Sequence, residues 1–453
     1  MTRSLHKIRL CVLPMLAVCL SLTNAIGGVR NQPAIDEVAA GMRTTAEADW
    51  WGFDEQDATD SLQAAIDSVA ERVVVPYVGK PWIVRPIRLR SDQVVTFEPG
   101  VLLLAKKGEF HGGGDSLLTA QNASDITIRG YGAVLRMRKT DYQGDAYEKA
   151  EWRMGLRLMG CRRVTVEGLR IENTGGDGIY VGSTRKNRWC EDVAIRDTTC
   201  WGNHRQGISV ISAVNLLVEN CLLAETDGTP PESGIDFEPD SADERLVNCV
   251  VRNCRFENNS GHAILVYLKP LATESQPVSI RFENCVSRMG KPGMSPRDFD
   301  NRRIHGWSGM AVGAVSDDGP QGLVEFVNCT SENTGREGAK VFDKSARSVR
   351  VRFVNCRWSN SWLSRHGEIA GPRVPVLLHL RNPEITRHPG GVEFVDCKVF
   401  ENRIGALVQY VDDSEKHGLQ NVTGEIGVRN RFGSRAQLGR DTRNVDLRLV
   451  EID

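Results

Sequence analysis

The sequence carries almost no excess charge of either sign. Its 57 lysine and arginine residues are matched by 58 aspartate and glutamate residues, which gives a formal net charge of −1. Proteins that bind nucleic acids or anionic membranes usually carry an excess of basic residues, so neither partner is expected here. Aromatic residues are also scarce, at 6%, whereas glycine is abundant, with 44 residues. This composition suits a fold of short strands joined by many turns.

The sequence also lacks a hydrophobic run long enough to span a membrane. The apolar stretch at residues 10–22 is shorter than the roughly 20 residues that a transmembrane helix requires. Arg3, Lys7 and Arg9 precede this stretch and small residues follow it, which is the pattern of a secretory signal peptide. We therefore predict that residues 1–25 are a signal peptide and that the mature chain is secreted or periplasmic.

No cysteine spacing of the Cys-x-x-Cys or cysteine–histidine type indicates a zinc site. Twelve cysteines in an exported chain would ordinarily indicate disulfides. Six of them instead follow Asn or Asp at one point of a repeat: Cys221, Cys254, Cys285, Cys329, Cys356 and Cys397. We predict that these six stack inside the fold as free thiols, because a thiol packs as a small apolar group. The sequence leaves undecided whether a disulfide forms among Cys161, Cys190 and Cys200.

What the sequence does contain is a repeated strand. A small residue followed by a short alternating strand occurs seven times, at Gly178, Gly207, Gly234, Ala263, Gly309, Gly338 and Gly405. Several of the steps are 27 or 29 residues long. A strand that recurs at a fixed period is typical of a solenoid, in which each coil buries its apolar face against its neighbours. A second strand in each coil ends at Asn, Asp or Gly, which tolerate the left-handed backbone of a sharp corner.

The repeats divide the chain. We predict a leader over residues 26–50, a solenoid over 51–430 and a C-terminal cap over 431–453. Residues 57–70 are predicted to form an amphipathic helix with Asp60 as its N-cap and with Leu62, Ala65, Ile66 and Val69 along its apolar face. Such a helix would plug the open end of the solenoid core.

These segments resemble the right-handed parallel β-helix proteins of the pectate lyase and polygalacturonase superfamily over roughly residues 50–430. Residues 57–67 look like the N-terminal helix of that family, and residues 73–76 and 97–100 look like its first strands. The resemblance implies an all-β, right-handed, single-stranded parallel β-helix with an N-terminal capping helix. It also implies a secreted carbohydrate-active enzyme. Because this fold supports many chemistries, the residues of the site have to decide the function.

Asp236 and Glu238 are the sharpest candidates for catalysis. On one strand their side chains project from the same face, about 6.7 Å apart at the backbone. Like charges this close require a cation, a basic partner or a raised pKa. Such a pair suits glycoside hydrolysis, with one acid and one base or nucleophile, but it could also bind calcium. A solvated strand edge beside Arg245 or Lys269 is the alternative without a site.

Asp177 is the third catalytic candidate. It resembles the Asn-Thr-Asp acid position of polygalacturonases, although a glycine follows Asn173-Thr174 and the paired aspartates of the next coil are replaced by residues 204–206. Strand geometry places Asp177 about 14 Å from Asp236, so the two are not expected to act directly as a pair. The alternative role for Asp177 is an Asp-Gly turn.

Five residues on neighbouring coils are candidates for binding substrate: His204, Arg205, His262, Tyr180 and Tyr267. Coils about 4.8 Å apart would bring them onto one patch with the carboxylates. His204 and Arg205 suit a sugar hydroxyl or carboxylate, and the tyrosines suit stacking on sugar rings. The pair Gly261-His262 resembles the Gly-His-Gly of the family, so His262 is expected to bind substrate or tune a carboxylate.

The leading interpretation is a glycoside hydrolase that acts on a polysaccharide through Asp236 and Glu238. The second is a calcium-dependent lyase on uronate-containing glycans, in which calcium sits on that pair and Arg205, Arg245 or Lys269 takes the proton. The third is a β-helix that binds glycans without catalysis. No cofactor is expected beyond calcium in the second interpretation.

Overall fold

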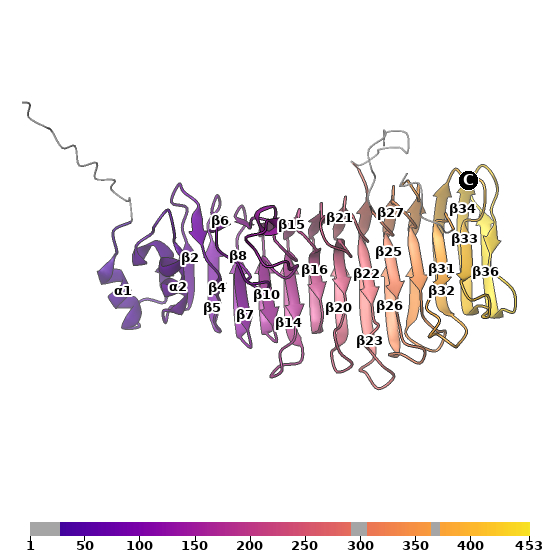
Figure 1. Ribbon diagram of the computed structural model, residues 1–453, viewed down its shortest axis with the longest axis horizontal. Coiled ribbons are helices and arrows are strands. Elements are labelled where there is room, and N and C mark those ends of the chain that lie inside the picture. Colours follow the sequence, from indigo (N-terminus) through magenta and orange to yellow (C-terminus); the bar gives the residue numbers. More distant parts are fainter. Residues whose placement is uncertain (1–27, 291–305, 364–371) are drawn as a thin grey trace, which may run out of the picture.

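The computed structural model describes residues 28–290, 306–363 and 372–453. The predicted signal peptide, residues 1–25, lies outside the described residues. The chain forms one long stack of parallel strands whose axis runs the length of the molecule (Figure 1). The predicted solenoid of parallel strands is therefore confirmed. None of the helices in the described ranges has the length and hydropathy of a bilayer-crossing segment.

One sheet contains 12 strands and carries the candidate site. Its strands, in order along the stack, are β4 (Ile87–Arg88), β7 (Leu118–Gln121), β10 (Leu156–Met159), β13 (Ile179–Gly182), β16 (Gln206–Val210), β19 (Ser233–Phe237), β22 (Ile264–Tyr267), β25 (Met310–Gly313), β28 (Ala339–Phe342), β31 (Val376–Leu380), β33 (Val408–Asp412) and β35 (Ala436–Gln437). We refer to it as the site sheet.

The second sheet contains 24 strands, because most coils contribute a longer and a shorter strand on either side of a corner. Its strands are β1 (Thr45–Glu47), β2 (Arg72–Val75), β3 (Trp82–Val84), β5 (Gln93–Phe97), β6 (Leu102–Ala105), β8 (Ser124–Arg129), β9 (Val134–Arg136), β11 (Arg162–Glu167), β12 (Arg170–Glu172), β14 (Cys190–Arg196), β15 (Thr199–Trp201), β17 (Ala213–Glu219), β18 (Leu222–Ala224), β20 (Leu246–Arg252), β21 (Arg255–Glu257), β23 (Val278–Glu283), β24 (Val286–Arg288), β26 (Gly322–Val327), β27 (Thr330–Glu332), β29 (Arg350–Val354), β30 (Arg357–Ser359), β32 (Gly390–Glu401), β34 (Gln420–Asn430) and β36 (Arg443–Glu451). We refer to it as the outer sheet.

The corners between these strands are formed by the predicted turn residues. Asn253, Asn284, Asn328 and Asn355 all have left-handed backbone, with φ between 49° and 55°. The amides of Asn284, Asn328 and Asn355 each donate to the preceding asparagine in the column, at N–O distances of 3.1, 3.1 and 2.8 Å. The ladder fixes the register of successive coils, because a slip of one residue would break every bond in it.

The interior is filled by stacked rows of apolar side chains. The rings of Phe282, Phe326, Phe353 and Phe394 stack coil on coil, with centroids 4.7–5.4 Å apart. All ten cysteines in the described residues are buried and free, including the six of the predicted row. Among the described residues, Cys161, Cys190 and Cys200 form no disulfide. Cys161 N–H instead donates to Cys190 Sγ at 3.3 Å.

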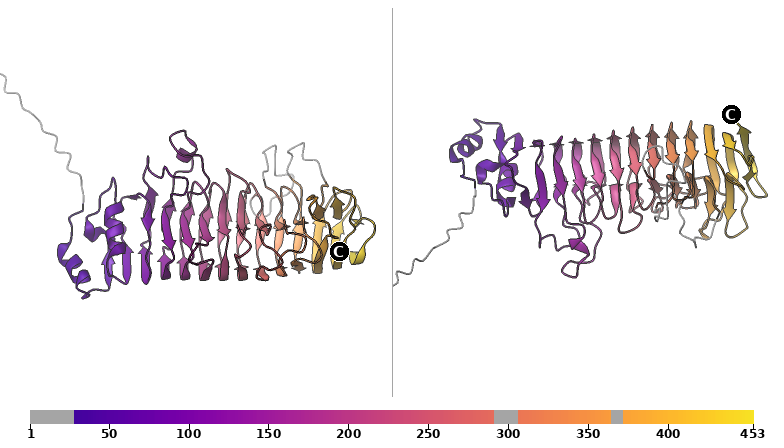
Figure 2. Two further views of the ribbon diagram at one scale, coloured as in Figure 1. Left: turned by 60° about the horizontal axis from the view of Figure 1, so that its bottom comes forward. Right: turned by 90° about the horizontal axis from the view of Figure 1, so that it is seen from above.

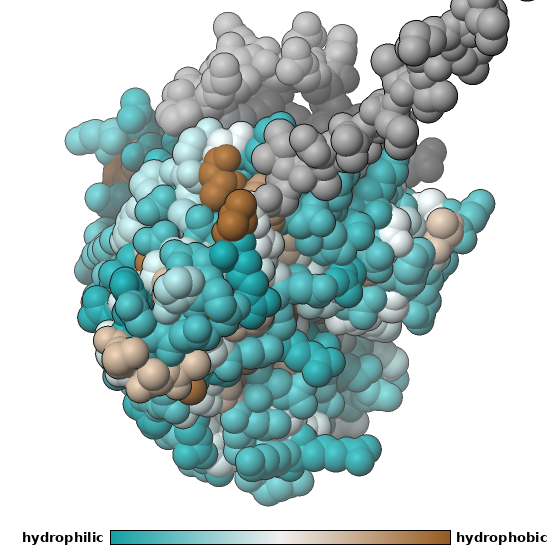
Figure 3. Space-filling view, turned by 90° about the vertical axis from the view of Figure 1, so that its left-hand side faces the viewer, coloured by the Kyte–Doolittle hydropathy of each residue, from teal (hydrophilic) through white to brown (hydrophobic). Residues whose placement is uncertain are grey.

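The N-terminal end of the stack is closed by helices α1 (Gln32–Ala39) and α2 (Thr59–Asp67) with the short 3-10 helix η1 (Ala48–Trp51); a second short turn, η2 (Asp141–Gln143), lies between β9 and β10. The predicted capping helix is present as α2, and its own side chains Leu62 and Ile66 are buried. Seen from this end, the surface is mostly hydrophilic (Figure 3), so the apolar interior is covered.

Two details of the helix prediction are wrong. The helix begins after Ala58 rather than at Asp60, and the Asp57 carboxylate accepts from Thr59 N–H at 3.1 Å. Asp60 therefore lies in the first turn, where its negative charge still suits the helix dipole. Val69 lies beyond the helix end and is 63% exposed, because the chain turns at Ser68 toward β2.

Candidate functional site

The candidate site lies on the outward face of the site sheet. The alternation of β13, β16 and β19 buries Ile208 and Ile235 in the core and turns Tyr180, Ser209 and Asp236 outward. These three outward residues occupy one register position on adjacent strands, so they form a row across the sheet. Glu238 follows Asp236 by two residues and projects to the same side.

The turn before β16 places Arg205 at the centre of a group of acidic side chains. Its Nη2 is 2.8 Å from Glu238 Oε2, its Nη1 is 3.8 Å from Asp177 Oδ2 and its Nε is 3.4 Å from Glu151 Oε1. The side chain is only 12% exposed. Burial opposes the charge of the guanidinium, but Asp177, Glu238 and Asp236 outweigh burial and raise its pKa. We call Glu151, Asp177, Asp236 and Glu238, with Arg205, the carboxylate cluster.

The cluster has a buried layer and a partly exposed layer. Asp177 and Asp236 have no exposed surface, whereas the side chains of Glu151 and Glu238 are 28% exposed. Gln206 donates to one oxygen of Asp236 at 3.0 Å. The other oxygen of Asp236 and both oxygens of Asp177 accept no hydrogen bond from any described residue.

Burial sets the protonation of the buried layer. Burial raises the pKa of Asp177 to about 7, and the attraction of Arg205 does not offset it. Burial, and then the neighbouring charge of Glu238, raise the pKa of Asp236 well above its usual range, and Asp177 adds to that rise. Four acidic groups around one guanidinium cannot all ionise at low cost, so the buried pair retains protons toward neutral pH.

Comparison with known proteins identifies the fold of this chain. The family model described as "Right handed beta helix region" matches residues 148–286, which include all five residues of the carboxylate cluster. The structure superposes on the family 28 exopolygalacturonase of Yersinia enterocolitica with a TM-score of 0.58 at 12% sequence identity, covering 89% of this chain and 78% of that one. This protein is a right-handed parallel β-helix protein.

Two further proteins resemble parts of this chain. The Dettilon tailspike protein superposes with a TM-score of 0.55 at 10% identity, over 90% of this chain and 70% of that one. The uncharacterized protein YclG of Bacillus subtilis (strain 168) is 29% identical over 126 residues, which are 25% of this chain and 22% of that protein. The chain therefore spans only about a fifth of the length of this curated relative.

The β-helix brings together four of the residues expected from the sequence. Asp177, Arg205, Asp236 and Glu238 all belong to the carboxylate cluster. Because Asp177 and Glu238 contact the same planar guanidinium, their carboxylates lie within about 9 Å of each other, a range found for pairs that act in glycoside hydrolysis. Asp177 lies two strands and three residues from the position of Asp236, as expected, and the Arg205 side chain contacts both Asp177 and Glu238.

The two histidines contact residues other than those of the carboxylate cluster. His204 is 6% exposed, and its Nε2 lies 2.8 Å from Thr229 Oγ1 and 3.4 Å from Gln143 Nε2. His262 is also 6% exposed; its Nδ1 accepts from Ser308 N–H at 3.3 Å and its ring packs edge-on against Trp307. Burial and three cations, Lys340, Arg336 and Arg381, lower the pKa of His262 well below its usual value. A neutral imidazole in such a place suits packing and hydrogen bonding.

The two tyrosines lie on either side of the cluster. Tyr180 is half-buried in the outward row, next to Arg157 of β10 and Ser209 of β16. Tyr267 packs against a small outward apolar group formed by Leu265, Ala311 and Phe342. Both rings thus lie along the outward face of the site sheet.

Glu151 was not expected from the sequence. It lies in the segment between β9 and β10, which projects from the stack in both views of Figure 2. Residues in such a segment follow no period, so the repeat gives no signal for them. The only available signal was the aromatic and charged composition of residues 142–153, which is unusual for a turn.

Within the described residues, no group of three or more His, Cys, Asp or Glu side chains is arranged to hold a metal ion. At Asp236 and Glu238, where calcium was the alternative, the Arg205 guanidinium supplies the positive charge. The geometry therefore favours a proton-transfer site over a calcium site.

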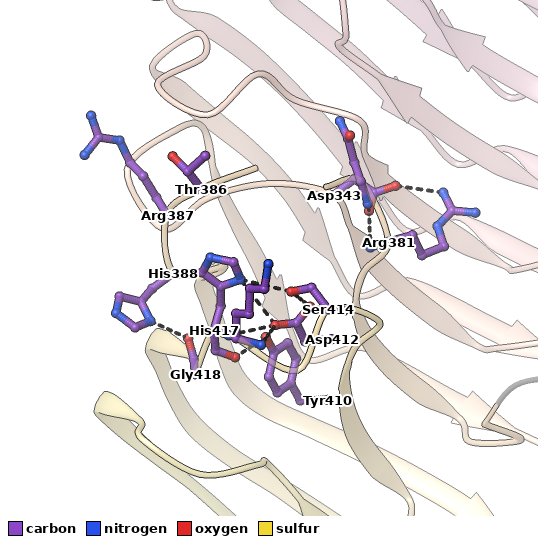
Figure 4. A network of polar contacts seen from close by, with 12 residues as sticks. Asp343, Arg381, Thr386, Arg387, His388, Tyr410, Asp412, Ser414, His417 and Gly418 are labelled. Carbon is purple, nitrogen blue, oxygen red and sulfur yellow. Dashed lines mark hydrogen bonds and ion pairs between the residues drawn. The ribbon is translucent and has the colours of Figure 1, made fainter. Parts of the chain in front are cut away.

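A second polar network lies near the C-terminal end of the stack (Figure 4). The Asp412 carboxylate accepts from Ser414 N–H and Oγ–H at 2.8 and 2.7 Å, and from Lys416 and His417 N–H at 2.9 and 2.7 Å. Tyr410 donates to His417 C=O at 2.6 Å. All of these bonds close one turn after β33, so this network has a structural role.

Proposed function

We propose that this protein is a glycoside hydrolase that cleaves a polysaccharide at the carboxylate cluster, with Asp236 and Glu238 as the reacting pair. The observation that carries the proposal is the difference between their environments. Asp236 is fully buried, which favours its protonated form, whereas Glu238 is partly exposed and ion-paired with Arg205. Glycoside hydrolysis by two carboxyl groups requires one proton donor and one carboxylate.

In this proposal Asp236 gives its proton to the oxygen of the scissile glycosidic bond as that bond breaks. Glu238 either takes a proton from the water that attacks the sugar carbon or bonds to that carbon itself. Asp177 holds a second proton and so limits the charge of the cluster. Because no part of Asp236 is exposed, the surrounding side chains have to rearrange when substrate binds. We also infer that the chain is exported, from the predicted signal peptide at residues 1–25.

The test is a screen of plant, algal and host polysaccharides for new reducing ends. On the substrate found, Asp236→Asn and Glu238→Gln should each lower kcat by about 10²- to 10⁴-fold, the usual contribution of a general acid or base. Glu393→Gln is the matched control, because Glu393 is an exposed carboxylate paired with Arg352 on the outer sheet. Circular dichroism should show all three variants folded. Activity retained in both site variants would reject the proposal.

A calcium-dependent lyase is supported by the placement of Asp236 and Glu238 on one strand beside an arginine. The raised pKa of Arg205 argues against it, because an arginine that holds its proton this firmly is a poor base. The two reactions differ in product. An unsaturated product that absorbs in the ultraviolet and disappears with a chelator would favour the lyase.

A glycan-binding role without catalysis is the third candidate, and the likeness to a tailspike supports it as much as the likeness to an exopolygalacturonase supports an enzyme. Measurable binding of a glycan that the protein never cleaves would favour this role. The buried, proton-holding pair is our reason for preferring hydrolysis, because a binding surface has no need for it.

A further inference from the structure

The two ends of the stack are built differently. The N-terminal end is closed by α1, α2 and η1, whereas no described helix follows η2 along the chain. The C-terminal end is formed by β36, the outermost strand of the outer sheet (Figure 1). β36 pairs with β34 along one edge, and no described strand pairs with its other edge. Backbone N–H and C=O groups along that edge are therefore free to pair with another strand.

The side chains of β36 are also uncovered. Val445, Leu447 and Leu449 pack against the core, yet each of them is only partly buried. None of residues 429–453 is buried. Native proteins usually protect an edge strand with proline, lysine or a covering segment. β36 contains neither proline nor lysine, so the apolar interior reaches the surface along an unprotected edge.

The order of residues along β36 makes the strand complementary to itself. When residues 445–449 of two copies are placed antiparallel about Leu447, Asp446 of each copy lies opposite Arg448 of the other. Val445 lies opposite Leu449, and the two Leu447 side chains meet at the centre. Opposite charges and apolar side chains at directly facing positions both stabilise an antiparallel pair of strands.

The neighbouring registers lack this complementarity. A shift of two residues is the smallest that keeps the apolar side chains on one face of the sheet. Such a shift places Asp446 opposite Asp446 in one direction and Arg448 opposite Arg448 in the other. The left-handed backbone of Asn444, with φ of 51°, ends the regular segment on its N-terminal side. The sequence of the strand thus selects the register about Leu447 over the two beside it.

We propose that the C-terminal end of this protein binds a second copy of the same chain by antiparallel pairing of the two β36 strands. The pairing joins the two outer sheets into one and covers Val445, Leu447 and Leu449 in both copies. Because each copy uses the same surface, the contact has two-fold symmetry and the assembly closes at two chains. The helices at the N-terminal end offer no matching edge, so the dimer does not grow into a fibre.

The interface is separate from the carboxylate cluster. In the site sheet, β19 lies six strands from β35 of the last coil, which is about 29 Å at a spacing of about 4.8 Å. The inference therefore does not depend on the proposed function, and the state of assembly can be measured without any substrate.

The test measures the mass of the wild-type protein by analytical ultracentrifugation over a wide range of micromolar concentrations. We expect a species with twice the mass of one chain. Asp446→Arg and Arg448→Asp each place like charges opposite one another in the pair, so each should raise the Kd of the dimer about tenfold or more. Both side chains are exposed, and the pair of Arg448 with Glu425 at 3.4 Å is exposed as well, so circular dichroism should show both variants folded.

A mixture of the two variants tests the register directly. One copy with Asp446→Arg and one copy with Arg448→Asp again have opposite charges at both facing positions, so the mixture should form a dimer with a Kd close to the wild-type value. The double variant Asp446→Arg/Arg448→Asp should do the same. Arg350→Asp is the matched control, because it reverses an exposed charge on β29, three strands from β36, and should leave the Kd unchanged.

Each of the other outcomes overturns the proposal. A wild-type protein that stays monomeric has no such interface. A dimer that persists in both single variants is held by another surface, and an equal weakening by Arg350→Asp would mean that net charge rather than β36 controls association. If the mixture of the two variants stays monomeric, the antiparallel pairing about Leu447 is wrong.

Discussion

Asp177 and Asp412 are both acidic side chains with almost no exposed surface, at 0% and 4%, and the chain treats them in opposite ways. Asp412 accepts four hydrogen bonds within its turn, and these bonds lower its pKa in spite of burial. Asp177 has only the weak support of Ser209 and the distant Arg205 guanidinium, and burial raises its pKa to about 7. Asp412 lies in a partly exposed turn and Asp177 lies deep under the site surface, so hydrogen bonding and depth of burial act together on the pKa of each carboxyl group.

The largest loss of stability should follow from substitution of Arg205, which is the one cation of the carboxylate cluster. Arg205→Met leaves four acidic groups without a counter-charge, so we expect a loss of about 3–5 kcal/mol in the free energy of unfolding near pH 8. The loss should shrink near pH 5, where the buried pair is protonated. Urea unfolding followed by circular dichroism measures it, with the exposed pair Arg163–Asp125 as control through Arg163→Met. An equal loss in both variants would contradict the special role of Arg205.

A change of opposite sign should follow from Asp177→Asn. The pKa of Asp177 is higher in the folded protein, at about 7, than in the unfolded chain, at about 4. Its contribution to the free energy of unfolding is therefore fully present below pH about 4 and is lost as pH rises through about 7. We expect the variant to be more stable than the wild type by about 1–3 kcal/mol near pH 8, since a neutral amide costs less to bury. Near pH 4 the advantage should vanish. Thermal unfolding across this range checks the crossover, and a variant less stable at every pH would refute it.

For Asp412→Asn we expect a smaller loss, about 1 kcal/mol near neutral pH, because an amide replaces a carboxylate that accepts charge-assisted bonds. The lowered folded pKa gives the reverse pH dependence: the stability from Asp412 is present above its unfolded pKa and is lost as pH falls through its folded pKa. The variant and the wild type should therefore converge in acid. If the stabilities of the variant and the wild type instead move apart as pH falls, the opposite pH dependence of Asp412 and Asp177 is contradicted.

The smallest effect should come from Glu151→Gln. Glu151 is partly exposed and lies 3.4 Å from Arg205, so solvent screens the pair and the loss should be about 0.5 kcal/mol or less. The same unfolding experiment measures it. A loss as large as that of Arg205→Met would mean that Glu151 belongs to the buried layer in solution.

The repeat in the sequence predicted much of the fold and part of the site. The recurring small residue before each strand fixed which residues share a register position, and so placed Asp236 and Glu238 on one outward face. It did not reveal that Asp236 is fully covered, because cover comes from side chains of other coils and from connecting segments that have no period.

The ladder of coils has one further consequence. Each coil between Tyr180 and Asp236 adds one strand spacing to the outward row. Further along the stack, the asparagine column and the phenylalanine stack repeat the same contacts from coil to coil. Gain or loss of a whole coil would therefore change the distance between two outward residues in fixed increments, and would need no new kind of contact inside the stack.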